Sequence, residues 1–164
     1  MQKTLEINID GYKIPLENGD IETLPNGKKI RLIMSPDYGT NINDFDYLGK
    51  VEWVSNHGGI RGYRPKNFDG SAEIVKRDGN ANLWWSPPKD VRIGSDIFRT
   101  IRKQALDVIE YGYYVYKLEL LDGLDAYERP IVTKVAALGG IEPFLENDDK
   151  IDILTGLYEG ITND

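Results

Sequence analysis

Apolar and polar residues alternate with a period of two along several short stretches of the chain, as they do in strands that bury one face. Turn-forming pairs separate these stretches, and Asp10-Gly11 is the clearest of them. The alternation predicts strands at residues 4–9, 12–16, 29–34, 48–54, 72–75 and 82–85, with Pro87-Pro88 stopping the last one. The chain up to this point is therefore expected to consist of strands, turns and loops.

The apolar spacing changes to three and four residues after Ser95, which is the pattern of a helix with one buried face. Ser95 can cap the first turn, Asp96 suits the positive N-terminal end, and Gly112 provides an end. The apolar stripe of the predicted helix is Ile97, Phe98, Ile101, Ala105, Val108 and Ile109. Its outward face is predicted to carry Arg99, Arg102, Lys103 and Asp107.

Two more strands and a second helix are expected after Gly112. Residues 113–121 alternate strongly, and residues 131–138 should return beside them, after a loop opened by Asp122-Gly123 and before Gly139-Gly140. The first strand is predicted to carry Tyr114, Tyr116, Leu118 and Leu120 on one face. A short helix is expected at residues 149–158, and the few residues beyond it have little apolar content to bury.

This order of elements is typical of an α+β protein. We expect a single two-layer domain over residues 1–164, with a mostly antiparallel sheet, one main helix and a short C-terminal helix. A chain of 164 residues with 40% hydrophobic and 29% charged residues is long enough for one sizeable core.

The composition also bears on where the protein acts. There are no cysteines, which removes disulfides, Cys-ligated zinc and thiol catalysis, and favours a reducing cytoplasm. No apolar run approaches the roughly 18 residues that a membrane-spanning helix needs, and the first residues do not resemble a signal peptide. We therefore expect a cytoplasmic protein without a membrane partner.

The charge is uneven along the chain. The formal net charge of −7 disfavours general nucleic-acid binding, which requires a basic surface. Residues 142–164 hold seven acids and a single base, Lys150, whereas residues 50–66 hold four bases and one acid. The acidic end is either a solvated surface or a tail that repels nucleic acid or engages a basic partner.

No catalytic signature stands out. A Ser-His-acid set would have to use His57, the one histidine, and the matching nucleophile motif is absent. Carboxylates gather at residues 44–46, 122–128 and 148–152, but none of these groups fits a calcium loop. No phosphate-binding or dinucleotide-binding loop is present either. The sequence thus predicts no cofactor, no metal and no catalytic residue, and a metal-dependent nuclease or hydrolase remains only as an alternative.

Residues 55–71 form the most informative segment, because glycines, cations and aromatic residues are interleaved there. Arginine side chains bind phosphates and carboxylates in a bidentate manner, and a tyrosine ring can stack on a base. The candidate binding residues of this segment are His57, Arg61, Tyr63, Arg64 and Lys66. The alternative is an ordinary exposed loop whose arginines balance nearby acids.

Trp84 and Trp85 are a second candidate binding element. Consecutive residues of a strand point to opposite faces, so one indole is expected in the core and the other at an exposed or covered face. An exposed Trp would suit an interface. The alternative is that both indoles are packed in the core.

A resemblance adds context to these patterns. The stretch Asp46-Tyr47-Leu48-Gly49, followed by Trp53, His57, Arg61, Tyr63 and Asn67-Phe68, resembles uncharacterised bacteriophage or prophage proteins that carry a D-N-L-G…W-H-R-R-Y…N-F-D pattern. The helix and the two strands after it resemble the end of those proteins. The match covers about half of the chain, Tyr47 replaces the usual Asn, and the middle segment is shorter. The resemblance implies a small protein that acts in the cytoplasm of a host bacterium.

Three functions follow as hypotheses. The first is a non-enzymatic phage accessory protein that binds and inhibits a host factor, for example in restriction, CRISPR or nucleotide-signalling defence. The second is a small-molecule binder that captures an anionic nucleotide signal with the 55–71 segment and an indole of the Trp pair. The third is the metal-dependent nuclease or hydrolase.

Overall fold

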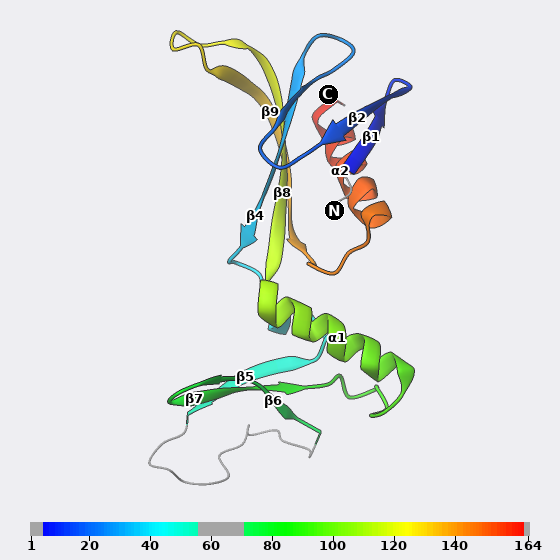
Figure 1. Ribbon diagram of the computed structural model, residues 1–164, viewed down its shortest axis with the longest axis vertical. Helices are drawn as coiled ribbons and strands as arrows, with labels where there is room; N and C mark the ends of the chain where they lie inside the picture. The colour runs from blue at the N-terminus through cyan, green and yellow to red at the C-terminus, as the bar shows by residue number, and fades with distance from the viewer. Residues whose placement is uncertain (1–4, 56–70, 163–164) are drawn as a thin grey trace. The chain divides into compact units, whose positions relative to one another are not determined.

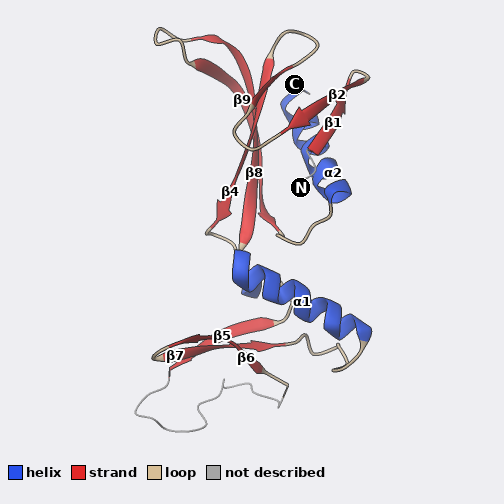
Figure 2. Ribbon diagram, viewed as in Figure 1, coloured by secondary structure: helices blue, strands red, loops and turns tan. Residues whose placement is uncertain are grey.

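The computed structural model describes residues 5–55 and 71–162, and the chain forms two compact units. Unit 1 combines residues 1–38 with residues 113–164, and unit 2 is formed by residues 39–112. The strands pair in antiparallel ladders, and two helices accompany them, so the expected α+β class is confirmed (Figure 1, Figure 2). None of the described helices is long and apolar enough to cross a membrane.

Unit 1 is built around a four-stranded sheet in the order β3-β4-β8-β9. Its strands are β3 (Ile21–Thr23), β4 (Lys29–Asp37), β8 (Tyr113–Leu124) and β9 (Pro130–Ile141). A hairpin of β1 (Leu5–Ile9) and β2 (Tyr12–Leu16) and the helix α2 (Asn147–Thr162) lie on one face of this sheet (Figure 1). The β1–β2 turn has φ angles of 53° at Asp10 and 85° at Gly11, which fits the predicted hairpin turn.

The core of unit 1 lies between the sheet and this layer. The face of β8 that the alternation predicted is the buried one, because Tyr116, Leu118 and Leu120 are buried in the core and Tyr114 packs against it. α2 begins before Asp149 and continues past Tyr158, and its Ile161 is only 3% exposed. The expectation that residues after Tyr158 bury little is therefore wrong, since the last turn of α2 brings Ile161 into the core.

Unit 2 consists of a three-stranded sheet in the order β5-β7-β6 with one helix, α1, packed on a face of it. The strands are β5 (Lys50–Ser55), β6 (Glu73–Asp78) and β7 (Ala81–Ser86), and a 3-10 turn, η1 (Ile42–Asp44), precedes them. α1 spans Asp96–Tyr111 as predicted, with Ser95 accepting a hydrogen bond from the amide of Phe98 and Gly112 at φ 71° after the last turn.

Several details of the predicted elements are corrected by the structure. Asp122-Gly123 and Gly139-Gly140 do not end their strands, because β8 and β9 continue through them as one long ladder with irregular register. Strand β3 was not expected, since only three residues form it. In α1, Ile97 is 66% exposed because it lies in the first turn, and Arg102 is not simply solvated but pairs with Glu73 of β6.

Candidate functional site

Five of the seven predicted binding residues lie outside the described residues. They are His57, Arg61, Tyr63, Arg64 and Lys66. The two tryptophans of β7 are described, and the structure gives them different surroundings.

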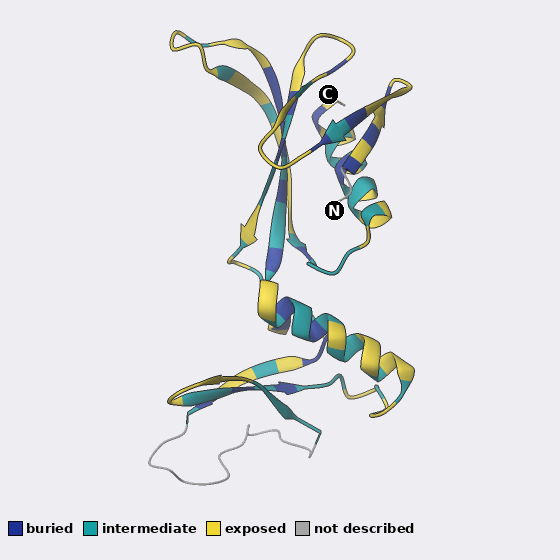
Figure 3. Cartoon of the chain, viewed as in Figure 1, coloured by how far each residue is buried: buried dark blue, intermediate teal, exposed yellow. Residues whose placement is uncertain are grey.

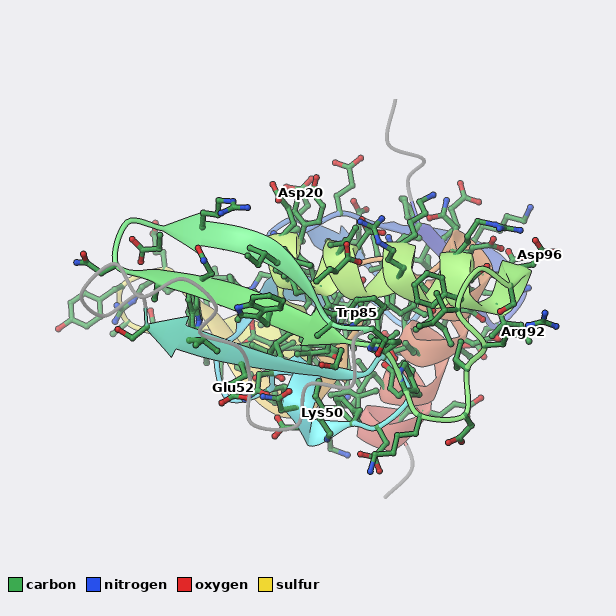
Figure 4. The ribbon with its side chains drawn as sticks, turned by 90° about the horizontal axis from the view of Figure 1, so that it is seen from below. Asp20, Lys50, Glu52, Trp85, Arg92 and Asp96 are labelled. Carbon is green, nitrogen blue, oxygen red and sulfur yellow. The ribbon has the colours of Figure 1, made fainter. Side chains whose placement is uncertain are left out.

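Trp85 is a core residue of unit 2. Its side chain is fully buried, its Nε1 donates a hydrogen bond to the carbonyl of Leu48 at 2.7 Å, and its ring lies 6.0 Å from that of Phe98 in α1. Figure 4 shows Trp85 among the side chains between the sheet and α1. An indole held in this way packs the helix onto the sheet and anchors the segment before β5.

Trp84 points to the opposite face of the sheet, where it lines an open groove of about 700 Å³. Its cross-strand partner in β5 is Glu52, and Lys50 lies two residues away on the same strand (Figure 4). The groove offers an aromatic and prolyl surface with mixed charge, three acids against two lysines. Its lining residues are Asp46, Gly49, Lys50, Val51, Glu52, Trp84, Ser86, Pro87, Pro88, Lys89 and Asp90.

The edges of the four-stranded and the three-stranded sheet form a second set of candidate surfaces, because an edge strand carries unpaired backbone groups that can recruit another strand. At β5 one side chain caps this edge at Val51. Asn43 donates from Nδ2 to the carbonyl of Val51 at 2.9 Å and accepts at Oδ1 from the amide of Val51 at 2.8 Å. The side chain of Asn43 therefore stands in for a neighbouring strand.

The edge strands β6 and β3 are poorly suited to pair with a further strand, for other reasons. In β6 the register with β7 shifts between Ile74 and Lys76, and the exposed end of the strand carries Lys76, Arg77 and Asp78. Bulges and charges of this kind discourage pairing with another strand. Strand β3 is only three residues long.

Strand β9 differs from these three edges. It has 12 residues, Lys134 is its one charged residue, and within the described chain no strand pairs with its outer side. Figure 3 shows that much of the strand is exposed. Four aliphatic side chains, which we call the β9 surface, are each 39–52% exposed: Ile131, Val132, Val135 and Leu138.

The turn between β8 and β9 extends this apolar surface and is itself well ordered by hydrogen bonds. Leu124 is 61% exposed and Tyr127 is 79% exposed. Asp125 accepts hydrogen bonds from the amides of Tyr127 and Arg129 at 2.8 and 2.9 Å, and the guanidinium of Arg129 lies 4.9 Å from the centre of the Tyr127 ring. These hydrogen bonds, above all the one from the Arg129 amide, lower the pKa of Asp125.

The sheet next to β9 carries a paired charge cluster. Glu119 of β8 is only 6% exposed and bonds to Arg31 of β4 at 2.9 Å, with Lys117 at 3.8 Å. Val135 of β9 is the cross-strand partner of Glu119 and so lies on the same face. This cluster satisfies its own charges, so we assign it a structural role.

The ionisable groups with shifted pKa values fit structural roles as well. Burial raises the pKa of Tyr116 and Tyr158, which lie in or against the core of unit 1, and the hydrogen bond to Glu73 raises the pKa of Arg102. Over residues 5–55 and 71–162, no three His, Asp or Glu side chains gather in a way that could hold a metal ion.

Comparison with known proteins identifies no relative: no family model matches the chain, and neither does any curated protein or solved structure. The bacteriophage resemblance therefore stays a prediction. Sequence reasoning found Trp84 but missed the β9 surface. The signal for it was available, because residues 130–141 contain one charge among 12 positions.

Proposed function

We propose that the protein is a non-enzymatic binding protein that docks onto a partner protein through the β9 surface. The observation that carries this proposal is the exposure of aliphatic side chains along a long edge strand, next to the exposed Leu124 and Tyr127. Apolar side chains that gather at the surface of a protein are typical of interaction sites. Here they line both faces of one edge strand, since Val135 lies opposite Glu119 and Leu138 opposite Tyr116. Burying one such side chain contributes about 1.5–3 kcal/mol, so a few of them can offset the cost of association.

The bacterial setting suggested by the sequence resemblance would make the partner a host protein. A protein that binds its partner without catalysing a reaction inhibits that partner by covering a surface that the partner needs for its own activity. On this basis we propose that the chain is a phage or prophage accessory protein that inhibits a host factor, with a defence system as the expected target.

The test is capture of a partner from host lysate by the tagged protein and by a double variant, Val135→Lys/Leu138→Lys. We expect the double variant to lose the partner while its melting temperature stays close to that of the wild type, because both side chains are about half exposed. The matched control is Ile93→Lys/Ile97→Lys, which places the same charges on exposed aliphatic residues of unit 2. Retention of the partner by the β9 variant would contradict the proposal.

One observation favours a second candidate function, a small-molecule binder that stacks a planar ligand, such as a nucleotide base, on Trp84. The observation is the groove of about 700 Å³ that Trp84 lines. A ligand that binds only the folded state raises the melting temperature by mass action. Thermal-shift screening with cyclic nucleotides should then give a shift that Trp84→Ala abolishes and Trp53→Ala, an exposed indole elsewhere on the sheet, preserves.

A further inference from the structure

The four-stranded sheet of unit 1 has a second face, opposite to α2 and the β1–β2 hairpin (Figure 1). Leu32 of β4 and Leu118 of β8 point into the core, so their neighbours along each strand point to this second face. One row of such neighbours crosses all four strands, and the adjacent rows add two lysines. We call these side chains the basic face: Ile21, Arg31, Glu119 and Val135 in the row, with Lys29 and Lys117 beside it.

The centre of the basic face carries an excess of positive charge. Glu119 bonds to Arg31 at 2.9 Å and lies 3.8 Å from Lys117, so two cations share one carboxylate. Lys29 is exposed two residues before Arg31. Asp37, at the far end of β4, accepts a hydrogen bond from a backbone amide of β9. The three rows thus hold three bases and one acid in a chain of net charge −7, and such a surface attracts an acidic partner.

Aliphatic side chains flank this charged centre on both sides. Ile21 is 40% exposed and Val135 is 52% exposed, at opposite ends of the row that crosses the sheet. The remaining positions of the three rows are aliphatic or threonine, and none of them is aromatic. Proteins that bind single-stranded nucleic acid stack the bases on aromatic side chains. The basic face therefore favours a protein with carboxylates and aliphatic side chains over a nucleic acid.

The width of the sheet suits a single helix. Neighbouring strands lie about 4.8 Å apart, so four strands span about 14 Å. An α-helix with its side chains is about 10–12 Å wide. A helix lying along the strands would place the middle of its contact stripe over Arg31 and Lys117, and the two margins of the stripe over Ile21 and Val135.

From these observations we infer that the partner docks an acidic amphipathic helix on the basic face, with Asp or Glu along the middle of the contact stripe and aliphatic residues on either side of it. This inference rests on the proposed function, because Val135 belongs to the β9 surface. It specifies the chemistry of the partner and the face of β9 that the partner covers.

A synthetic helix provides the probe. We choose a capped peptide with three repeats of Glu-Ala-Gln-Leu-Leu-Gln-Ala, in which each Glu lies between two Leu side chains on one face of the helix. The matched peptides carry Gln or Lys in place of every Glu. Titration of the full chain, followed by NMR, should show the Glu peptide binding at least about tenfold more tightly than the Gln peptide. The Lys peptide should bind more weakly still, and added salt should weaken binding of the Glu peptide.

A charge variant makes the test specific to the basic face. Lys29→Glu/Lys117→Gln should abolish the preference for the Glu peptide over the Gln peptide and leave the melting temperature close to that of the wild type. The matched control is Lys76→Glu/Lys103→Gln, which makes the same change of charge on exposed lysines of unit 2 and should keep the preference.

The methyl signals of Ile21 and Val135 locate the bound peptide, and both should shift when the Glu peptide is added. Three results would overturn the inference. The first is a Glu peptide that does not bind, or binds no more tightly than the Gln peptide. The second is binding that leaves both methyl signals unchanged. The third is tighter binding of a single-stranded thymidine oligonucleotide at the same methyl groups, which would make nucleic acid the ligand.

Capture from lysate separates this inference from the proposed function. A partner that is lost with Val135→Lys/Leu138→Lys but retained by Lys29→Glu/Lys117→Gln would leave the proposed function intact and overturn the acidic helix. Loss of the partner with both variants is the expected result. Retention by both would contradict the proposed function and, with it, the inference.

Discussion

Strands β5 and β9 each lie at the edge of a sheet and direct backbone groups away from their one neighbouring strand. The residues around these two edges differ. Beside β5, the amide group of Asn43 takes both the donor and the acceptor of Val51. Along the outer side of β9, within the described chain, no further strand is paired, and aliphatic side chains are exposed along it. The comparison teaches that a single side chain of this chain caps an edge strand at one residue, Val51, whereas β9 exposes several aliphatic side chains that call for a functional explanation.

The largest effect is expected at Gly49, which sets the position of the segment that carries Asn43. Gly49 has φ +86°, and a Cβ there would collide with the carbonyl oxygen of Ser86 and stand 2.9 Å from Nε1 of Trp85. Gly49→Ala should therefore cost more than about 4 kcal/mol of unfolding free energy, since backbone cannot yield as a side chain does. Denaturant unfolding measures this, with Gly27→Ala as control, because Gly27 has the same φ and open space around it. Equal losses in the two variants would mean that φ strain alone matters.

Truncation after Tyr158 tests the unit that carries β9. The cut removes Ile161, whose burial contributes about 1.5–3 kcal/mol, so thermal unfolding should show a loss of that order. A chain cut after Thr162 keeps Ile161 and serves as the control. If both chains melt like the full-length protein, the last turn of α2 does not dock on the core.

Asn43→Ala should open the β5 edge and so make it resemble β9. The loss of two hydrogen bonds to Val51 should lower stability by about 1–2 kcal/mol. Because an open edge recruits other strands, light scattering should also detect more self-association. Asn43→Asp keeps the acceptor for the Val51 amide and should lie between wild type and Ala. If the Asn43→Ala protein is as stable and as monomeric as the wild type, Asn43 does not protect the β5 edge. The contrast between β5 and β9, which supports the role of β9, is then lost.

The smallest effect concerns the turn at the end of the β8–β9 hairpin. The pKa of Asp125 is lowered in the folded state, so its contribution is complete above the unfolded pKa and is lost as the pH falls through the folded one. In acid, the protection of the Tyr127 and Arg129 amides, relative to their intrinsic exchange rates at the same pH, should therefore fall, while the melting temperature changes little because the carboxylate is at the surface and partly exposed. NMR of these two amides measures the protection, and Asp125→Asn should make the protection independent of pH. Acid-resistant protection of both amides in the wild type would contradict this assignment.

Much of the fold could be predicted from local patterns. The alternation of residues identified most strands, and Ser95, Gly112 and the apolar spacing between them located α1. What local patterns could not show are the effects of distant residues. Gly139-Gly140 looked like a strand end, but Asp37 accepts a hydrogen bond from the amide of Gly140 at 2.7 Å and fills the space where Gly139 lacks a side chain, so the ladder continues.

The candidate sites show the same limit. Period-two alternation was enough to predict different surroundings for Trp84 and Trp85, because adjacent residues of a strand point to opposite faces of the sheet. It could not identify the β9 surface, since the apolar residues of 131–138 look alike whether another strand covers them or not. Which edge stays open depends on the order of strands in the sheet, and that order is set by contacts between residues far apart in the chain.

The pairing of Asp37 with Tyr113 has a consequence for the order in which the protein is made. These two residues face each other across β4 and β8, and the whole of unit 2 connects them where a hairpin would have only a short turn. During synthesis β4 leaves the ribosome long before β8, its central partner, exists. Unit 2, in contrast, is continuous in sequence and can fold as soon as it emerges. The segment inserted in the middle of the chain is thus expected to be the first to fold, and the two ends of the chain, which share one sheet, the last.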